Sequence, residues 1–114
     1  MAAVVDSSGW IEYFTQGPNC GHFEAAILDT ENLVVPAICI TEVHRWMLRE
    51  TSVADALTVA AAMRQARVVP LDERLAVLAA ELSHRHQLRL ADGIIYSTSR
   101  SCSAELWTQD ADLE

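Results

Sequence analysis

The sequence predicts an α/β fold, a three-layer sandwich with a short central parallel sheet. Two observations predict it. Short apolar runs typical of buried strands recur along the chain, and longer segments with helical periodicity separate them. Strands joined through helices pair in parallel, because the chain must cross over the sheet between them. The length of 114 residues suits one domain, which we expect to span residues 1–114.

Four runs have the length and composition of buried strands, with valine, leucine or tryptophan in most positions. They are AAVV at 2–5, LVVP at 33–36, RVVP at 67–70 and ELWT at 105–108. Helices are expected in the intervals. Ser7 or Ser8 can cap a first helix that runs through WIEYF. After the turn signal QGPNCG, the segment HFEAAILDT at 22–30 predicts a second helix.

Apolar spacing predicts four more helices. Thr41 begins a helix over 41–50, with one face made of Val43, Trp46 and Met47. The next covers 53–66, with a stripe made of Val53, Ala56, Leu57 and Ala60. Asp72 caps a helix whose leucines repeat at helical spacing, namely Leu71, Leu75, Leu78 and Leu82. A last helix over 90–102 precedes the fourth strand.

Composition excludes several classes of protein. The net charge is −8, and all eight cations are arginines, so lysine nucleophiles and the phosphate-loop lysine cannot be built. A phosphoryl-accepting receiver domain also needs a lysine and is rejected on that ground. The longest apolar run, at 33–40, is too short to span a membrane. Three widely spaced cysteines argue against a disulfide framework and favour the cytoplasm.

Four carboxylates fall where strands end or helices begin. Asp6 follows the first strand, Glu42 lies at the entry to the helix after the second, Asp92 opens the helix before the fourth, and Asp110 follows that strand. In parallel sheets, functional groups collect beyond the carboxyl ends of the strands. Each acid alone is ordinary as a loop or helix-start residue, so only their grouping is informative.

Grouped carboxylates need neutralisation. Two of them about 5 Å apart repel by about 3 kcal/mol at an effective dielectric constant of about 20. Hard divalent cations such as Mg²⁺ or Mn²⁺ prefer oxygen ligands and neutralise such a group. A cation held there polarises a phosphodiester and activates water. It also supplies the positive charge that an acidic chain needs to bind nucleic acid.

The ordered motifs VVDSSGWIEYF, ITEV, LRLADGIIYSTSR and LWTQDADLE resemble the PIN-domain family, and within it the VapC-type ribonuclease toxins of prokaryotic toxin–antitoxin pairs. The resemblance covers essentially the whole chain. It implies hydrolysis of single-stranded RNA by metal-activated water, with Mg²⁺ or Mn²⁺ as cofactor. The ligands that it implies are Asp6, Glu42, Asp92 and Asp110, with Ser7 and Thr108 as supporting hydroxyls.

Two features depart from the family pattern. Gly93 stands where alanine or another small side chain is commoner, which loosens the start of that helix by up to about 1 kcal/mol. The chain stops at Glu114, where related proteins continue into a fifth strand, so that edge strand is missing here or trimmed. Asp112 is an alternative to Asp110 as the fourth acid, although Asp110 lies nearer the strand end.

The resemblance also implies partners: RNA, a VapB-like antitoxin and a second copy of the chain in a homodimer. Candidate contacts with antitoxin or dimer partner are Trp10, Trp46 and Met47. Candidates for guiding RNA are Arg89 and Arg45, with Arg49, Arg85 and Arg100 beside them. The alternative function is a catalytically inactive PIN-fold binding module that acts through a protein partner.

Overall fold

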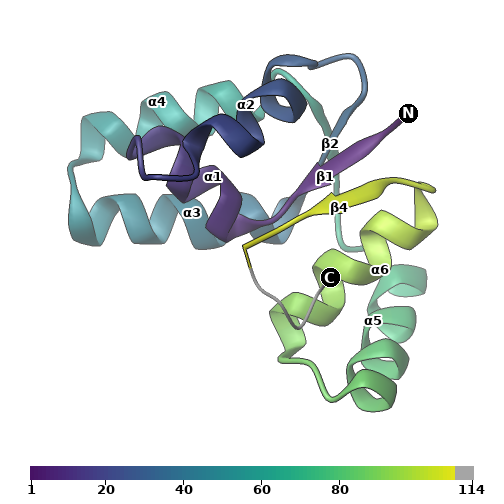
Figure 1. Cartoon of the computed structure of the whole chain (residues 1–114). Helices are drawn as coiled ribbons and strands as arrows, with labels where there is room; N and C mark the ends of the chain where they lie inside the picture. The colour runs from purple at the N-terminus through teal and green to yellow at the C-terminus, as the bar shows by residue number, and fades with distance from the viewer. Residues whose placement is uncertain (110–114) are drawn as a thin grey trace.

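The structure is a computed structural model and describes residues 1–109. Within them, four parallel strands alternate with six helices, as the sequence predicts (Figure 1). The strands are β1 (Ala3–Val5), β2 (Leu33–Pro36), β3 (Arg67–Val69) and β4 (Glu105–Trp107). The helices are α1 (Ser7–Phe14), α2 (Cys20–Leu28), α3 (Ala37–Glu50), α4 (Val53–Met63), α5 (Glu73–His86) and α6 (Leu90–Ser101).

The sheet has the order β3-β2-β1-β4. The chain builds outward from β1 to β2 and β3, then returns across the sheet to place β4 on the other side of β1. In open parallel sheets such a reversal creates a crevice at the carboxyl ends of the two strands that flank it. Here those strands are β1 and β4, and their last residues, Val5 and Trp107, are paired.

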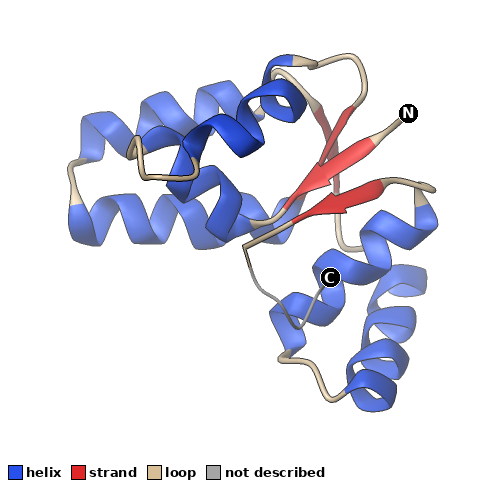
Figure 2. Ribbon diagram, viewed as in Figure 1, coloured by secondary structure: helices blue, strands red, loops and turns tan. Residues whose placement is uncertain are grey.

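Helices cover both faces of this sheet, which confirms the three-layer prediction. Figure 2 shows the strands between the group α1 to α4 and the pair α5 and α6. The first group packs on a core that includes Val4, Val5, Trp10, Phe23 and Val35, all with no exposed surface. None of the helices in the described part of the chain is long and apolar enough to cross a membrane.

The predicted start of the third helix is wrong. Helix α3 begins at Ala37 rather than at Thr41, so Glu42 lies in its second turn and not at its entry. Pro36 lies at the boundary, as the last residue of β2 and the N-cap of α3, where its missing N–H removes no intrahelical hydrogen bond. Burial of Cys39 then compensates for the low helix propensity of the isoleucines beside it.

Other boundaries shift by two or three residues. Helix α2 runs over Cys20–Leu28 rather than 22–30, and α4 ends at Met63 rather than at residue 66. The predicted stripe on α4 is also rotated, because Val53 and Leu57 are 64% and 58% exposed. The buried face instead consists of Ala56, Val59, Ala60 and Met63. Its alanines allow α4 to pack closely on α3, which local periodicity does not reveal.

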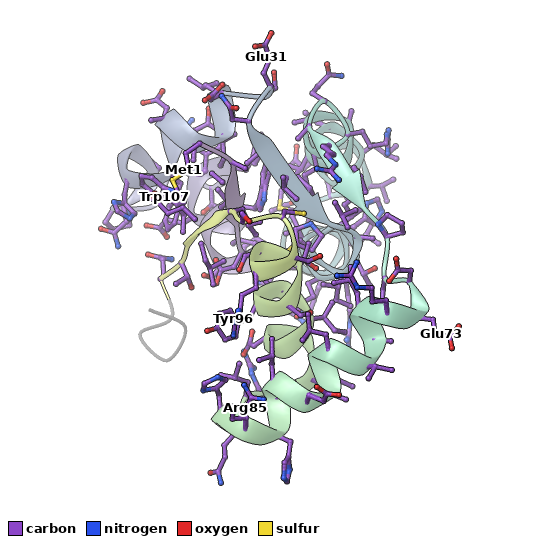
Figure 3. All side chains as sticks on the ribbon, turned by 90° about the vertical axis from the view of Figure 1, so that its right-hand side faces the viewer. Met1, Glu31, Glu73, Arg85, Tyr96 and Trp107 are labelled. Carbon is purple, nitrogen blue, oxygen red and sulfur yellow. The ribbon has the colours of Figure 1, made fainter. Side chains whose placement is uncertain are left out.

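Helices α5 and α6 form an antiparallel hairpin, and Figure 3 shows Tyr96 beside α6. The ring centres of Tyr96 and His86, which comes from α5, lie 5.7 Å apart. Asp72 caps α5 as predicted, accepting a hydrogen bond from the Leu75 N–H at 2.8 Å. Leu75 and Leu82 of the predicted apolar stripe are buried. Leu71 precedes the helix and is 45% exposed, so it does not belong to the buried face.

Gly93 is explained by this hairpin. A Cβ at that position would lie 1.7 Å from Ser83 Oγ and 3.0 Å from the Ala79 carbonyl oxygen. Close packing of α5 on α6 therefore requires glycine. Glycine at position 93 therefore meets a packing requirement between the two helices, and it is not explained as a weak start of α6.

Candidate active site

The site begins where β1 and β4 end side by side. Asp6 follows β1 directly and Thr108 follows β4, and both side chains are buried, with 4% and 5% of their surface exposed. The Thr108 hydroxyl donates a hydrogen bond to Asp6 Oδ2. The parallel pairing of Val5 with Trp107 brings these two residues together.

Asp6 also starts helix α1. Its Oδ1 accepts hydrogen bonds from the Gly9 N–H at 2.9 Å and from Ser8 Oγ at 2.8 Å. Asp6 is therefore the N-cap, and the prediction that Ser7 or Ser8 caps this helix is wrong. Aspartate caps as well as serine does, so the Asp-Ser-Ser-Gly sequence contained the signal. Three donors offset the cost of burying the carboxylate and hold its orientation.

Ser7 connects β1 to the second acid. Its Oγ donates a hydrogen bond of 2.7 Å to Glu42 Oε1, although the two residues are 35 positions apart. Glu42 is half-buried on α3, on the side of that helix that meets the start of α1. Asp6 and Glu42 are thus each held by a hydroxyl group, Thr108 for the first and Ser7 for the second.

Asp92 lies in the first turn of α6 with 14% of its side chain exposed. Its Oδ2 pairs with Arg89 Nε at 3.1 Å. The Arg89 side chain is 84% exposed, so this pair lies at the boundary between the site and solvent. The pairing places Arg89, a predicted RNA-guiding residue, beside one of the predicted acids.

Cys39 is a buried thiol within reach of the charges of the three acids. Its thiol is fully buried and lies 4.0 Å from the Val5 carbonyl oxygen. Burial raises the pKa of this thiol far above its ordinary value. A hydrogen bond with Ser7 lowers the pKa by a smaller amount, and the charges of Glu42, Asp6 and Asp92, each weaker again, raise it. The charges of a carboxylate after β1, one on α3 and one on α6 thus act on the same buried group. The sequence indicates only that Cys39 is a core residue, because nothing local reveals what surrounds it.

The acids do not form a closed cage. Within residues 1–109, no three side chains of histidine, cysteine, aspartate or glutamate come close enough together to hold a metal ion by themselves. Asp110 and Asp112, the two candidates for the fourth acid, lie outside the described residues, as does the region of the expected fifth strand.

Two predicted partner contacts are corrected. Trp10 has no exposed surface and Met47 is 4% exposed, because both side chains fill the core of this chain. Their side chains therefore offer almost no exposed surface for contact with an antitoxin or a second copy of the chain. Trp46 is half-buried against the same core and keeps an exposed part.

The predicted RNA-guiding arginines separate into two groups. Arg89 pairs with Asp92, and Arg45 and Arg49 lie on α3 together with Glu42. Arg85 lies at the carboxyl end of α5, which leads into Arg89 and Asp92. Arg100 lies at the other end of α6 and stacks over Tyr96, with its guanidinium carbon 5.9 Å from the ring centre.

Comparison with known proteins identifies the architecture. The family model described as the PIN domain matches residues 3–114. A comparison of the sequence with curated proteins finds no match.

Solved structures match over nearly the whole chain at low sequence identity. One is a chain of a toxin–antitoxin complex from Klebsiella pneumoniae, with 18% identity, a TM-score of 0.80, and coverage of 96% of this chain and 87% of that one. Another is Mycobacterium tuberculosis VapC20, described as a Sarcin-Ricin loop cleaving toxin, with 20% identity, a TM-score of 0.81, and coverage of 98% and 92%. A third is PAE2754 from Pyrobaculum aerophilum, with 21% identity, a TM-score of 0.73, and coverage of 99% and 85%. At these identities the likeness shows the fold.

Proposed function

The chain belongs to the PIN-domain family, and from this premise we propose that it is a metal-dependent endoribonuclease that cleaves single-stranded RNA. We further propose that it acts as the toxin of a type II toxin–antitoxin pair. One observation carries the nuclease proposal. Asp6 is held by Thr108 at the carboxyl ends of β1 and β4, and the next residue, Ser7, donates a hydrogen bond to the carboxylate of Glu42 on α3.

The chemistry of these residues fits Mg²⁺ or Mn²⁺. The donors are carboxylate oxygens, the ligands that these hard cations prefer. The buried Cys39 thiol stays protonated, so it does not offer a soft ligand that would favour zinc. Mg²⁺ keeps several of its waters and binds through one or two carboxylates plus substrate phosphate, so it does not need a closed protein cage.

The residues of the chain have separate tasks in this proposal. Asp6, Glu42 and Asp92 would hold the cation, with Asp110 as the proposed fourth acid. Thr108 and Ser8 fix the Asp6 carboxylate, and Ser7 fixes Glu42. Partners of this kind orient ligands, and their loss typically costs about 10- to 100-fold in metal affinity or activity. A bound cation would supply Lewis-acid activation of water and neutralise charge that develops on the phosphate.

An antitoxin partner is proposed on the fold relation to a chain from a toxin–antitoxin complex. We also propose that two copies of the chain form a homodimer. The cytoplasm is the proposed location, because RNA is present there and the three cysteines remain reduced.

The experiment is cleavage of a structured RNA pool in Mg²⁺, in Mn²⁺ and in chelator. Wild type is compared with Asp6→Asn, which keeps the shape of the side chain but removes its charge. The matched control is Asp55→Asn, the same change at an exposed position in α4. Circular dichroism checks that all three proteins fold equally.

We expect cleavage by wild type and by Asp55→Asn, and none by Asp6→Asn or in chelator. Folded wild type that neither cleaves RNA nor binds cation at millimolar concentration would contradict the proposal. That result would favour the alternative, a catalytically inactive binding module acting through its protein partner.

A further inference from the structure

We propose that one face of α3, the line Glu42–Arg45–Arg49, is the track along which the RNA strand leaves the active site. Arg45 and Arg49 would bind its phosphates. This inference rests on the proposed function. It adds the face of α3 over which the RNA strand runs and the two residues that bind the strand.

The three residues share a face because of their spacing. Positions three and seven apart lie on the same side of an α-helix. The rise of about 1.5 Å per residue places Arg49 about 10 Å along the helix from Glu42. A strand whose scissile phosphate lies at the acids must continue past one side of them, and this face of α3 begins there.

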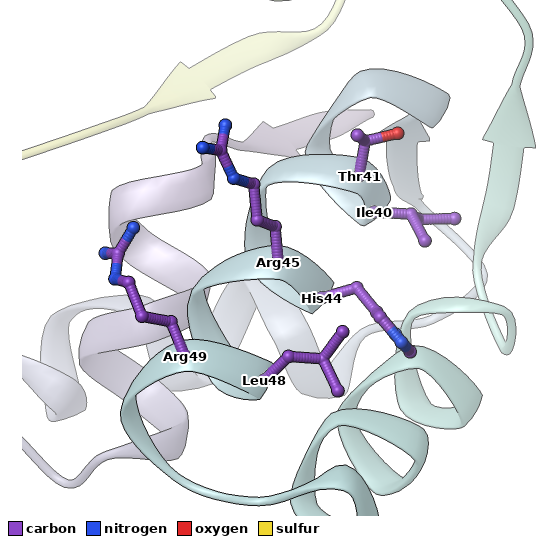
Figure 4. Close-up of a pocket in the computed structure, with 6 residues that line it drawn as sticks. All are labelled: Ile40, Thr41, His44, Arg45, Leu48 and Arg49. Carbon is purple, nitrogen blue, oxygen red and sulfur yellow. The ribbon is translucent and has the colours of Figure 1, made fainter.

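A groove on α3 includes both arginines. It has a volume of about 550 Å³ and is lined by Ile40, Thr41, His44, Arg45, Leu48 and Arg49. Figure 4 shows Arg45 and Arg49 extending along one side of the helix, while Ile40, His44 and Leu48 project along the neighbouring side. One side thus offers guanidinium groups to phosphates, and the other offers an apolar surface with a flat ring against which bases can rest.

The arginines are available for such contacts. Glu42, the natural helix partner of Arg45, accepts its hydrogen bond from Ser7 instead. Within residues 1–109, Arg45 is exposed and makes no ion pair. Arg49 Nε lies 3.5 Å from Glu50 Oε2, with the two side chains 61% and 47% exposed. A pair this exposed contributes little and exchanges readily for a phosphate.

Charge favours a polyanion over other occupants of this surface. The chain carries a net charge of −8, so an RNA strand is repelled by most of its surface. Two exposed arginines one helical turn apart, in line with an acid of the site, give it a local cationic path.

The test measures RNA binding without cleavage. In the full-length Asp6→Asn protein, fluorescein-labelled single-stranded RNA oligonucleotides of mixed sequence are titrated by anisotropy between about 50 and 200 mM salt. The test variant adds R45Q and R49Q. The matched control adds R64Q and R67Q, the same change in charge at exposed positions before and at the amino end of β3. Because all the strands are parallel, the amino end of β3 lies on the opposite side of the sheet from the carboxyl ends of the strands, where Asp6 lies.

We expect R45Q/R49Q to weaken binding about tenfold or more at the lowest salt, because each arginine loses a charge-assisted contact. The slope of log affinity against log salt should fall by about 0.7 per lost phosphate contact, so by about 1.4 in the double variant. The control should keep the slope of its Asp6→Asn parent.

An unchanged slope in R45Q/R49Q would contradict the proposal that Arg45 and Arg49 bind RNA phosphates. It would not affect the nuclease proposal. An unchanged slope together with a shift in oligomeric state on size exclusion would assign this face to an interface between copies of the chain. If the parent binds no RNA at any salt and wild type cleaves none, the track and the proposed function are both overturned.

Discussion

The Thr108 hydroxyl donates a hydrogen bond to the carboxylate of Asp6, although the two residues are 102 positions apart in the sequence. Both are buried at the ends of adjacent parallel strands. The contact therefore connects the last strand of the described fold to the first and holds an acid of the candidate site. Loss of this hydrogen bond should lower the stability of the fold and change the orientation of the Asp6 carboxylate.

Thr108→Val should lower the free energy of unfolding by about 1–3 kcal/mol, because it leaves a buried carboxylate oxygen without this donor. Urea denaturation measures the change. Thr58→Val is the control, since that hydroxyl is exposed and bonds the backbone of its own helix, to the Ala54 carbonyl oxygen. Equal stability of the two variants would show that the Thr108 contact contributes nothing.

Arg89→Gln should tighten Mn²⁺ binding by about three- to tenfold, because it removes a positive charge that pairs with Asp92 at 3.1 Å. Isothermal titration calorimetry measures the affinity without any need for activity. Folding stability should change by less than about 1 kcal/mol, since the Arg89 side chain is 84% exposed and its charge is well screened by solvent. Arg74→Gln, the same change at an exposed position at the other end of α5, is the control. Equal affinity in the two variants would show that Arg89 does not act on the cation site.

Gly93→Ala should destabilise the protein by about 1–3 kcal/mol, because its Cβ would overlap Ser83 Oγ. Thermal or urea unfolding measures this. The hydroxyl of Ser83 is buried without a hydrogen-bond partner within the described residues, so Ser83→Ala alone should be neutral or stabilising and should partly rescue Gly93→Ala.

Gly21→Ala provides the contrast. It lies in α2 with nothing within 4 Å of the added methyl group. It should therefore stabilise the protein by up to about 1 kcal/mol. If the two alanine variants had the same effect, helix propensity rather than the α5–α6 contact would explain Gly93.

Cys39 predicts a loss of stability at alkaline pH. Burial and the three acids raise the pKa of its thiol above the ordinary value of 9.0, so the native state keeps a proton that the unfolded chain releases. Above about pH 9 the unfolded chain binds fewer protons than the native state, and the free energy of unfolding falls by up to about 1.4 kcal/mol per pH unit.

Urea unfolding of wild type and Cys39→Ala across this range isolates the effect. The variant is less stable at neutral pH, because the methyl group leaves a cavity, but its stability should fall less steeply above pH 9. Parallel pH profiles would show that Cys39 ionises in the native state as readily as in the unfolded chain.

Much of this protein could be predicted from local pattern. Short valine-rich runs between amphipathic segments indicate the α/β class, and three of the acids that the structure gathers around Cys39 were predicted as site residues. Asp6 alone is an ordinary residue after a strand, and its grouping with Glu42, Asp92 and Asp110 is what indicates a site. Such signals depend on the chemistry of neighbouring positions, which the linear order of residues contains.

Tertiary structure alone decided how these acids are held. The hydrogen bonds from Thr108 to Asp6 and from Ser7 to Glu42 join residues 102 and 35 positions apart. They exist because β4 adds beside β1 rather than beside β3, and because α3 starts early enough to turn Glu42 toward α1. Strand order and helix rotation minimise the free energy of the whole packed core, so no local window of the sequence specifies them.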